Sequence, residues 1–266
     1  MSWFHPIAPS LALRDLLDCR YVAVSAGHHD LLPDGCMDLV WTADLGVMLC
    51  GPDTAGWSFD MPAGVSMAGV RFRPGAASGV FGVAASELVD RRVALADLLG
   101  ARATRLLTAR LEDAADGRTR MAVFEELVRN RRADAEPTVE MAALVAADPR
   151  TSVDDLADRA GVSARQLRRR FDRAVGYGPA FLTRVARLQR FAKGAVREPA
   201  RGIADLAAAA GYADQAHLAK DVRAFAGRTP RQLLGVLARS SLAVDVGPGD
   251  RSVQDVAGSA GARSAA

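Results

Sequence analysis

Residues 155–162, DLADRAGV, recur fifty positions later as residues 205–212, DLAAAAGY. After one inserted residue the register becomes fifty-one, and the matches continue through glycine, proline and leucine positions. The further matched pairs are Leu167 with Leu218, Phe171 with Val222, Gly176 with Gly227, Pro179 with Pro230 and Leu182 with Leu233. Because glycines and prolines keep their places over this length, one supersecondary unit is predicted to occur twice.

The first copy has the sequence pattern of a helix, a tight turn and a second helix. Ser152 is a suitable cap for the first helix, and Gly161 stands where the chain has to leave that helix through a left-handed conformation. Ser163 and Gln166 have the spacing of a capping box for the second helix. Ala157, four residues before Gly161, is small enough to let the two helices cross closely. These features predict a helix-turn-helix unit.

The second helix of each copy is predicted to have an apolar face and a polar face, and Asp214 is the expected cap of the later one. Apolar residues three or four positions apart share the inner side: Leu167, Phe171, Ala174, Leu218, Val222 and Phe225. The outer sides carry the residues that we expect to contact DNA: Arg165, Arg168, Arg169, Gln215, His217 and Lys220. Other arginines, predicted to be phosphate contacts or solvated surface, are Arg170, Arg173, Arg184, Arg187 and Arg228.

Residues 179–197, between the two copies, are predicted to form one continuous helix with Pro179 in its first turn. Nineteen residues at about 1.5 Å each span roughly 28 Å. Successive major grooves on one face of B-DNA lie about 34 Å apart. A helix of this length could therefore hold two recognition helices over consecutive turns of one duplex.

Residues 138–234 resemble the DNA-binding domain of the AraC/XylS family of bacterial transcription regulators. The matching stretches are GVSARQLRRRFDRAVGYGPAFLTRVARLQR and GIADLAAAAGYADQAHLAKDVRAFAGRTPRQLL. The resemblance implies seven helices, a long central one, and recognition helices at about 163–174 and 214–225 that face two successive grooves. Ala216 and Ala219 are smaller than the polar residues often used there, and Val222 replaces the usual aromatic residue. The second unit is therefore expected to contribute mostly backbone contacts.

The charge of the chain is unevenly distributed. Residues 140–240 hold 18 Lys and Arg against 10 Asp and Glu, a balance of +8. Residues 1–139 hold 14 against 18, a balance of −4. A basic surplus confined to the repeated region is what a polyanion-binding module needs. Arginine accounts for 32 of the 34 basic residues, which suits bidentate contacts to guanine and phosphate but equally fits coding bias in the source genome.

The N-terminal half begins with short β-prone runs separated by turn residues. These runs are Tyr21–Val24, Asp38–Trp41, Val47–Cys50, Trp57–Phe59 and Gly69–Phe72. They predict a small antiparallel barrel or sandwich. Before them we expect an irregular lead and a short helix, Leu11–Cys19. After them, helical periodicity returns at Ser86–Leu88, Leu95–Leu99, Ala103–Asp113 and Thr119–Arg131.

The predicted fold class is α+β, with the β barrel or sandwich and its helices followed by the all-α double helix-turn-helix domain. Four segments are predicted: an N-terminal sensing or oligomerisation domain at 1–132, a polar linker at 133–137, the DNA-binding domain at 138–240 and a disordered tail at 241–266. The tail prediction depends on a composition rich in Gly, Ser, Ala and Asp without periodicity.

Two stretches of the N-terminal half, LPDGCMDLV at 32–40 and GVRFRPG at 69–75, resemble the domain that precedes AraC-type domains in many actinobacterial-style regulators. That resemblance implies sensing or oligomerisation and assigns no ligand. One interpretation is a structural ion pair between Asp38 and Arg71 or Arg73 across strands. The alternative is an effector pocket, whose predicted residues are Trp41, Trp57, Phe72, Asp38 and Arg71.

Other chemistries are poorly supported by the sequence. His28, His29 and Asp30, with Cys36 and Cys50 downstream, lack the tight ligand pairs of a metal site. No nucleophile elbow, phosphate loop or dinucleotide fingerprint occurs. We therefore predict no cofactor, no metal site and no catalytic residue. The three scattered cysteines suit a reducing compartment, and no signal peptide or membrane-length apolar run is found, so a cytoplasmic location is predicted.

Together these observations predict a one-component transcription regulator that is not an enzyme. Its expected partners are double-stranded promoter DNA, RNA polymerase, an unidentified small-molecule effector and a second copy in a homodimer, with no membrane. Two alternatives stay open: a constitutive DNA-binding regulator without a ligand and, with less support, a DNA-binding domain joined to an enzymatic N-terminal domain.

Overall fold

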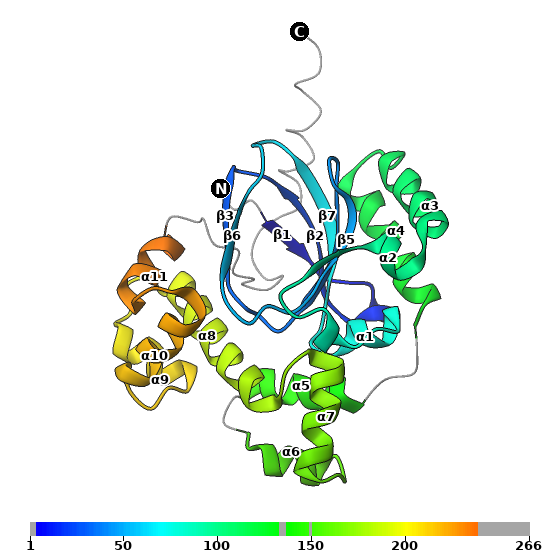
Figure 1. Ribbon diagram of the computed structural model, residues 1–266. Helices are drawn as coiled ribbons and strands as arrows, with labels where there is room; N and C mark the ends of the chain where they lie inside the picture. The colour runs from blue at the N-terminus through cyan, green and yellow to red at the C-terminus, as the bar shows by residue number, and fades with distance from the viewer. Residues whose placement is uncertain (1–3, 133–136, 149–150, 239–266) are drawn as a thin grey trace.

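The structure is a computed structural model that describes residues 4–132, 137–148 and 151–238. A β-rich N-terminal part precedes an all-helical C-terminal part, which is the predicted α+β class (Figure 1). The strands are β1 (Phe4–Ile7), β2 (Leu17–Val24), β3 (His28–Leu31), β4 (Met37–Thr42), β5 (Gly46–Cys50), β6 (Trp57–Asp60), β7 (Ser66–Phe72) and β8 (Arg92–Ala94). Helices of the N-terminal part are α1 (Ala76–Phe81), α2 (Leu95–Leu99), α3 (Ala101–Glu112) and α4 (Gly117–Asn130), with short 3-10 turns η1 (Leu11–Leu13) and η2 (Ala85–Glu87).

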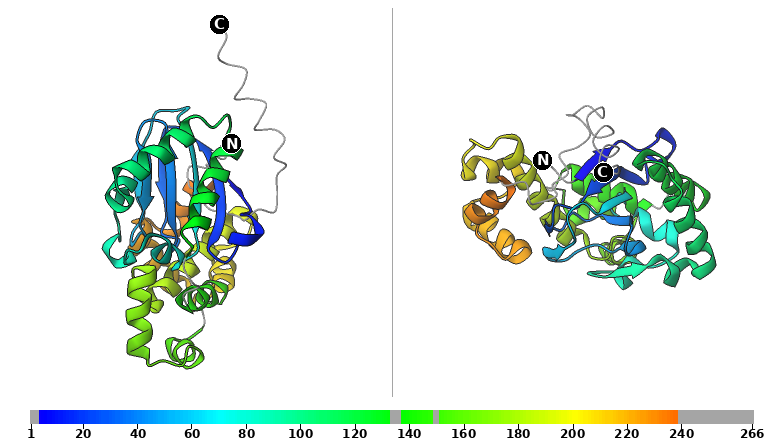
Figure 2. Two further views of the ribbon diagram at one scale, coloured as in Figure 1. Left: turned by 90° about the vertical axis from the view of Figure 1, so that its right-hand side faces the viewer. Right: turned by 90° about the horizontal axis from the view of Figure 1, so that it is seen from above.

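Six strands form one antiparallel sheet in the order β1-β2-β7-β4-β5-β8, and β3 pairs with β6 in a separate two-stranded sheet. Side chains alternate between the faces of the large sheet, as the two-residue period of a strand requires. Trp41 and Phe72 belong to an apolar core on one face, shared with Phe124 of α4 and Leu111 of α3. Helices α3 and α4 cover this face (Figure 2). Tyr21 belongs to a smaller cluster on the other face.

The predicted helix at Leu11–Cys19 is wrong. Only Leu11–Leu13 is helical there, as a 3-10 turn, and strand β2 already begins at Leu17. From Leu17 onward buried and half-buried residues alternate, so this stretch follows the period of a strand. The predicted strand began at Tyr21, four residues too late, although the alternation of Leu17 and Cys19 with Asp18 and Arg20 already has the period of a strand.

The C-terminal part contains seven helices among its described residues, as the family resemblance implies. They are α5 (Pro137–Ala147), α6 (Val153–Arg159), α7 (Ala164–Val175), α8 (Pro179–Arg197), α9 (Ile203–Ala210), α10 (Gln215–Ala226) and α11 (Pro230–Ala238). The central helix α8 has the predicted bounds and 19 residues. Pro137, the last residue of the predicted linker, begins α5, whereas residues 133–136 and the predicted tail at 241–266 lie outside the described residues.

The predicted helix caps are all confirmed. Ser152 accepts a hydrogen bond from the amide of Asp155, and Asp214 accepts one from the amide of His217 at 2.7 Å. Ser163 and Gln166 form the reciprocal capping box at the start of α7. The turns between the paired helices contain Gly161 and Gly211, both with positive φ angles, +61° and +91°. The second helix of each pair therefore starts at a position that the sequence fixes locally.

Replacing Ser163 by alanine should lower the free energy of unfolding by about 1 kcal/mol. The backbone amide of Gln166 lies in the first turn of α7, where it has no acceptor within the helix, and the substitution removes the serine oxygen that accepts its hydrogen bond. Urea unfolding of the full chain would measure the change. Ser86→Ala, an exposed serine in η2, is the matched control and should change stability much less. Equal losses in the two variants would contradict the capping role.

The two parts of the chain pack against each other at both helix-turn-helix units. Helix α7 of the first unit lies beside α1 and η2, and Ser78 Oγ donates to the Ala174 carbonyl at 3.0 Å. Beside the second unit, Leu32 belongs to the apolar cluster formed by α8 to α11. Gln189 Nε2 donates to the Pro33 carbonyl at 2.7 Å. The N-terminal part is thus in direct contact with both units.

Candidate nucleic-acid interface

Helix α7 presents a basic face to solvent. Leu167, Phe171 and Ala174 are buried, as predicted, in the apolar cluster that joins α7 to α5 and α6. The three predicted contact residues, Arg165, Arg168 and Arg169, are all exposed on the opposite side. A hollow of about 420 Å³ lies along the same helix and is lined by Gln166, Arg169, Arg170 and Arg173. Guanidinium groups in this arrangement can make bidentate hydrogen bonds to guanine edges and to phosphates.

Helix α10 of the second unit offers a sparser polar face. Gln215 is exposed, as predicted, and Lys220 is exposed as well, while Leu218, Val222 and Phe225 are buried in the second core. His217 is only partly exposed, and its ring packs edge-on against Tyr212 with centroids 5.1 Å apart. The histidine that was predicted to face DNA therefore also has a packing role inside its unit.

Two arginines predicted as phosphate contacts or solvated surface instead have specific protein partners. Arg184 of α8 pairs with the carboxylate of Asp221 on α10, Nη2 to Oδ1 at 2.8 Å, and its guanidinium lies 4.8 Å from the Phe225 ring centroid. Asp221 is buried, so the arginine compensates a charge inside the second unit. Arg228, in the turn after α10, pairs with Asp30 of β3.

Sequence reasoning did not identify Asp221 as structural. Its position on the buried side of α10, one residue before Val222, is the signal that could have shown it, since a lone carboxylate there needs a partner. The partner lies 37 residues away on α8 and can be found only in the fold.

The five residues of the predicted effector pocket are not brought together. Trp41 and Phe72 point into the core under α3 and α4, whereas Asp38 and Arg71 lie on the other face of the sheet. The physical reason is the strand period, because positions 38 and 41, like 71 and 72, differ by an odd number of residues. Trp57 lies on β6, where the Arg92 guanidinium stacks 3.8 Å from its ring centroid.

The predicted ion pair between Asp38 and Arg71 is confirmed. Arg71 donates from Nε and Nη2 to the two carboxylate oxygens of Asp38 at 3.0 and 2.9 Å, and Nη1 lies 3.0 Å from Asp34 Oδ2. Burial raises the pKa of Asp38 above its ordinary value, and the positive charge of Arg71 opposes that shift. Arg73 does not take part, since its Nε donates to the Arg14 carbonyl.

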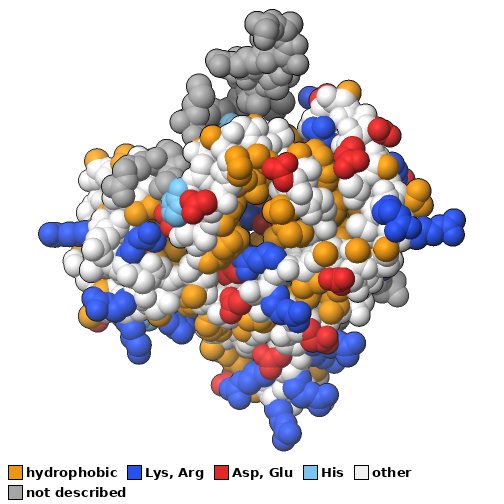
Figure 3. Space-filling model, turned by 45° about the horizontal axis from the view of Figure 1, so that its top comes forward, with side chains coloured by type: hydrophobic (Ala, Val, Ile, Leu, Met, Phe, Trp, Pro, Cys, Tyr) orange, Lys and Arg blue, Asp and Glu red, His pale blue; other side chains and the backbone are white. Residues whose placement is uncertain are grey.

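Basic side chains are conspicuous on the helical part of the surface. In the view of Figure 3, Lys and Arg side chains gather at the lower edge and on the left, over the helices of the C-terminal part.

Within the described residues no group of three or more His, Cys, Asp and Glu side chains could hold a metal ion. No helix among them is both long enough and apolar enough to cross a bilayer.

Comparisons with known proteins identify two domain models that match this chain. Residues 156–235 match a family model described as a helix-turn-helix domain, and residues 5–94 match one described as a domain of unknown function (DUF6597). No curated protein matches. Among solved structures, ToxT from Vibrio cholerae O395 is 9% identical, with 82% of this chain and 98% of that chain covered and a TM-score of 0.44. A second ToxT structure is 10% identical, with 88% and 98% covered and the same TM-score.

Two capped helix pairs, each with an exposed polar second helix, define this chain as a helix-turn-helix DNA-binding protein. Residues 156–235 of its C-terminal part form that helix-turn-helix domain, which is the kind of domain that the AraC/XylS resemblance predicts.

Proposed function

We propose that this chain is an AraC-type transcription regulator, which reads a promoter with α7 and α10 in two consecutive major grooves of one duplex. The observation that carries the proposal is the exposed arginine face of α7, held rigid by its capping box and by the buried Leu167 and Phe171. The 19 residues of α8 span roughly 28 Å, which suits two helices placed about one duplex turn apart.

In this proposal the two units contribute unequally. Arg165, Arg168 and Arg169 carry most of the base reading, while Gln215 and Lys220 assist from α10 and His217 stays near its packing partner Tyr212. Ala216 is exposed and Ala219 half-buried on α10, and neither can donate a hydrogen bond from its side chain. Backbone contacts to phosphate then make up the larger share at the second unit.

Arg168→Ala should weaken specific binding by about 1 to 3 kcal/mol and relax the preference at one base pair, because an exposed guanidinium on a recognition helix reads a single base edge. Selection of bound duplexes from random sequence, followed by anisotropy titration, measures both effects. Arg197→Ala, an exposed arginine at the end of α8, is the matched control. An unchanged sequence preference and affinity for Arg168→Ala would refute the role.

We further propose that the N-terminal part controls binding by taking up a small molecule, by pairing with a second copy, or by both. Its contacts with α7 and with the second core support this proposal, because a change in the β-rich part has a direct route to both units. A thermal-shift screen of metabolites on the full chain, with sedimentation of the free and stabilised forms, tests it. No stabilising compound and a monomer under all conditions would favour a constitutive regulator.

A further inference from the structure

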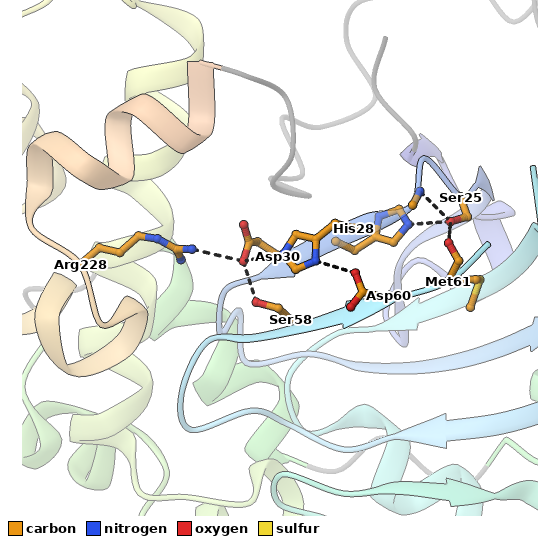
Figure 4. Close-up of polar contacts among 9 residues, drawn as sticks. Ser25, His28, Asp30, Ser58, Asp60, Met61 and Arg228 are labelled. Carbon is orange, nitrogen blue, oxygen red and sulfur yellow. Dashed lines mark hydrogen bonds and ion pairs between the residues drawn. The ribbon is translucent and has the colours of Figure 1, made fainter. Parts of the chain in front are cut away.

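An arginine of the second helix-turn-helix unit is held by a carboxylate from the other part of the chain. Arg228 Nη2 lies 3.4 Å from Asp30 Oδ1, and the same oxygen accepts a hydrogen bond from Ser58 Oγ at 2.7 Å (Figure 4). The Asp30 residue is only 6% exposed, whereas the Arg228 side chain is 35% exposed. Asp30 is therefore fixed in place, and Arg228 is the member of the pair that can move.

The two-stranded sheet of β3 and β6 is fixed beside the end of α10 by contacts that do not depend on this ion pair. The Gly56 amide donates to the Phe225 carbonyl at 2.5 Å, and Leu32 packs into the second core. A cavity of about 340 Å³ lies at this junction and is lined by the two strands and by residues 226–228. Arg228 can therefore leave Asp30 without opening a packed core.

The two-stranded β3–β6 sheet carries further charged groups near Asp30. His28 lies between two carboxylates, with Nδ1 2.8 Å from Asp60 Oδ1 and Nε2 3.8 Å from Asp30 Oδ1. Asp60 is exposed, and its ion pair is with His28 rather than with Arg228. A carboxylate that accepts hydrogen bonds from a guanidinium uses N–H donors that are then not available to a phosphate.

We propose that the two-stranded β3–β6 sheet is an intramolecular competitor of DNA at the second unit. In the free protein Arg228 forms an ion pair with Asp30, and this ion pair has to break before Arg228 can contact a phosphate. This inference rests on the proposed function, because it concerns the same DNA-binding surface and its regulation. The apparent affinity for DNA is then reduced by the fraction of molecules in which Arg228 is still paired.

Asp30→Asn should tighten binding by about twofold to fivefold, the range expected when one partly exposed ion pair no longer competes. The probe is a labelled duplex recovered by selection with the full chain, titrated by anisotropy at fixed salt. Asp60→Asn removes the same charge from the same two-stranded sheet and should leave affinity unchanged. In an Arg228→Gln background, Asp30→Asn should give no gain in DNA affinity, because the arginine for which Asp30 and the phosphate compete is no longer present.

Asp30→Ala serves as the second variant if Asp30→Asn folds poorly, and circular dichroism melting checks every form. Equal affinities of wild type, Asp30→Asn and Asp60→Asn would overturn the inference while the proposed function stands. An undiminished gain in the Arg228→Gln background would also overturn it, since the effect would then come from bulk charge. Failure of the wild type to bind any selected duplex would refute the proposed function itself, and the competitor role with it.

Discussion

Replacing Arg71 by alanine should lower the free energy of unfolding by about 3 to 5 kcal/mol at neutral pH, because it leaves two mostly buried carboxylates without their cation. Arg71 is 8% exposed and lies on β7 between Asp38 and Asp34. Its two hydrogen bonds to Asp38 join neighbouring strands in the middle of the sheet. Urea unfolding of the full chain, followed by circular dichroism, measures the loss.

The deficit of Arg71→Ala should shrink as the pH is lowered from 7 toward 4. Burial already raises the pKa of Asp38, and removal of the cation raises it further. A carboxyl whose folded pKa is raised favours folding most below its unfolded pKa, about 3.9, and this contribution is lost as the pH rises through the folded pKa. The variant should therefore lose stability, relative to wild type, as the pH rises.

Arg73→Ala is the matched control for this experiment. Arg73 lies two residues away and is half-buried, but its hydrogen-bond partner is the Arg14 carbonyl rather than a carboxylate. Its removal should cost less than about 1 kcal/mol, as for most substitutions outside a buried network. Similar losses in the two variants would show that the cluster around Arg71 is hydrated and contributes little.

The same cluster illustrates what the sequence predicts and what it does not. The pair between Asp38 and Arg71 was predictable, because both residues lie in runs with strand character and opposite charges attract across strands. The third member, Asp34, precedes β4 in a turn, and its position depends on how that turn folds back. The predicted effector pocket grouped Trp41 and Phe72 with Asp38 and Arg71, and the structure places the two aromatic residues on the opposite face of the sheet because side chains alternate along a strand.

The helical part was predicted more closely because its signals are local. Capping residues such as Ser163 and Asp214, and glycines at left-handed turns, determine helix ends from a few neighbouring residues. The repeat itself shows which residues are equivalent. Long-range pairs such as Arg184 with Asp221 and Arg228 with Asp30 have no local signal, since the partners are separated by 37 and 198 residues.

Removing Arg165, Arg168 and Arg169 together should weaken binding to the selected duplex by about a hundredfold to a thousandfold, less than the sum of three single effects, because neighbouring side chains share one groove. All three side chains are exposed on α7 and none supports the core, so the fold should be retained. Substitution of Gln215 and Lys220 by alanine should cost much less, since the second unit depends more on its backbone.

A smaller net charge alone would also weaken binding to a polyanion, so the control has to remove the same charge elsewhere. Arg102, Arg105 and Arg118 are exposed on α3 and α4 of the N-terminal part, and their replacement by alanine lowers the charge equally. If α7 is the reading helix, the first triple variant should lose both affinity and sequence preference. Its logarithmic salt slope should fall by about 0.9 for each phosphate that the variant no longer neutralises. The control variant should keep its preference and most of its slope, because charges far from the groove release no counterions from the bound site. Equal losses in the two triple variants would mean that the chain binds DNA through its overall charge, and α7 would then have no special role.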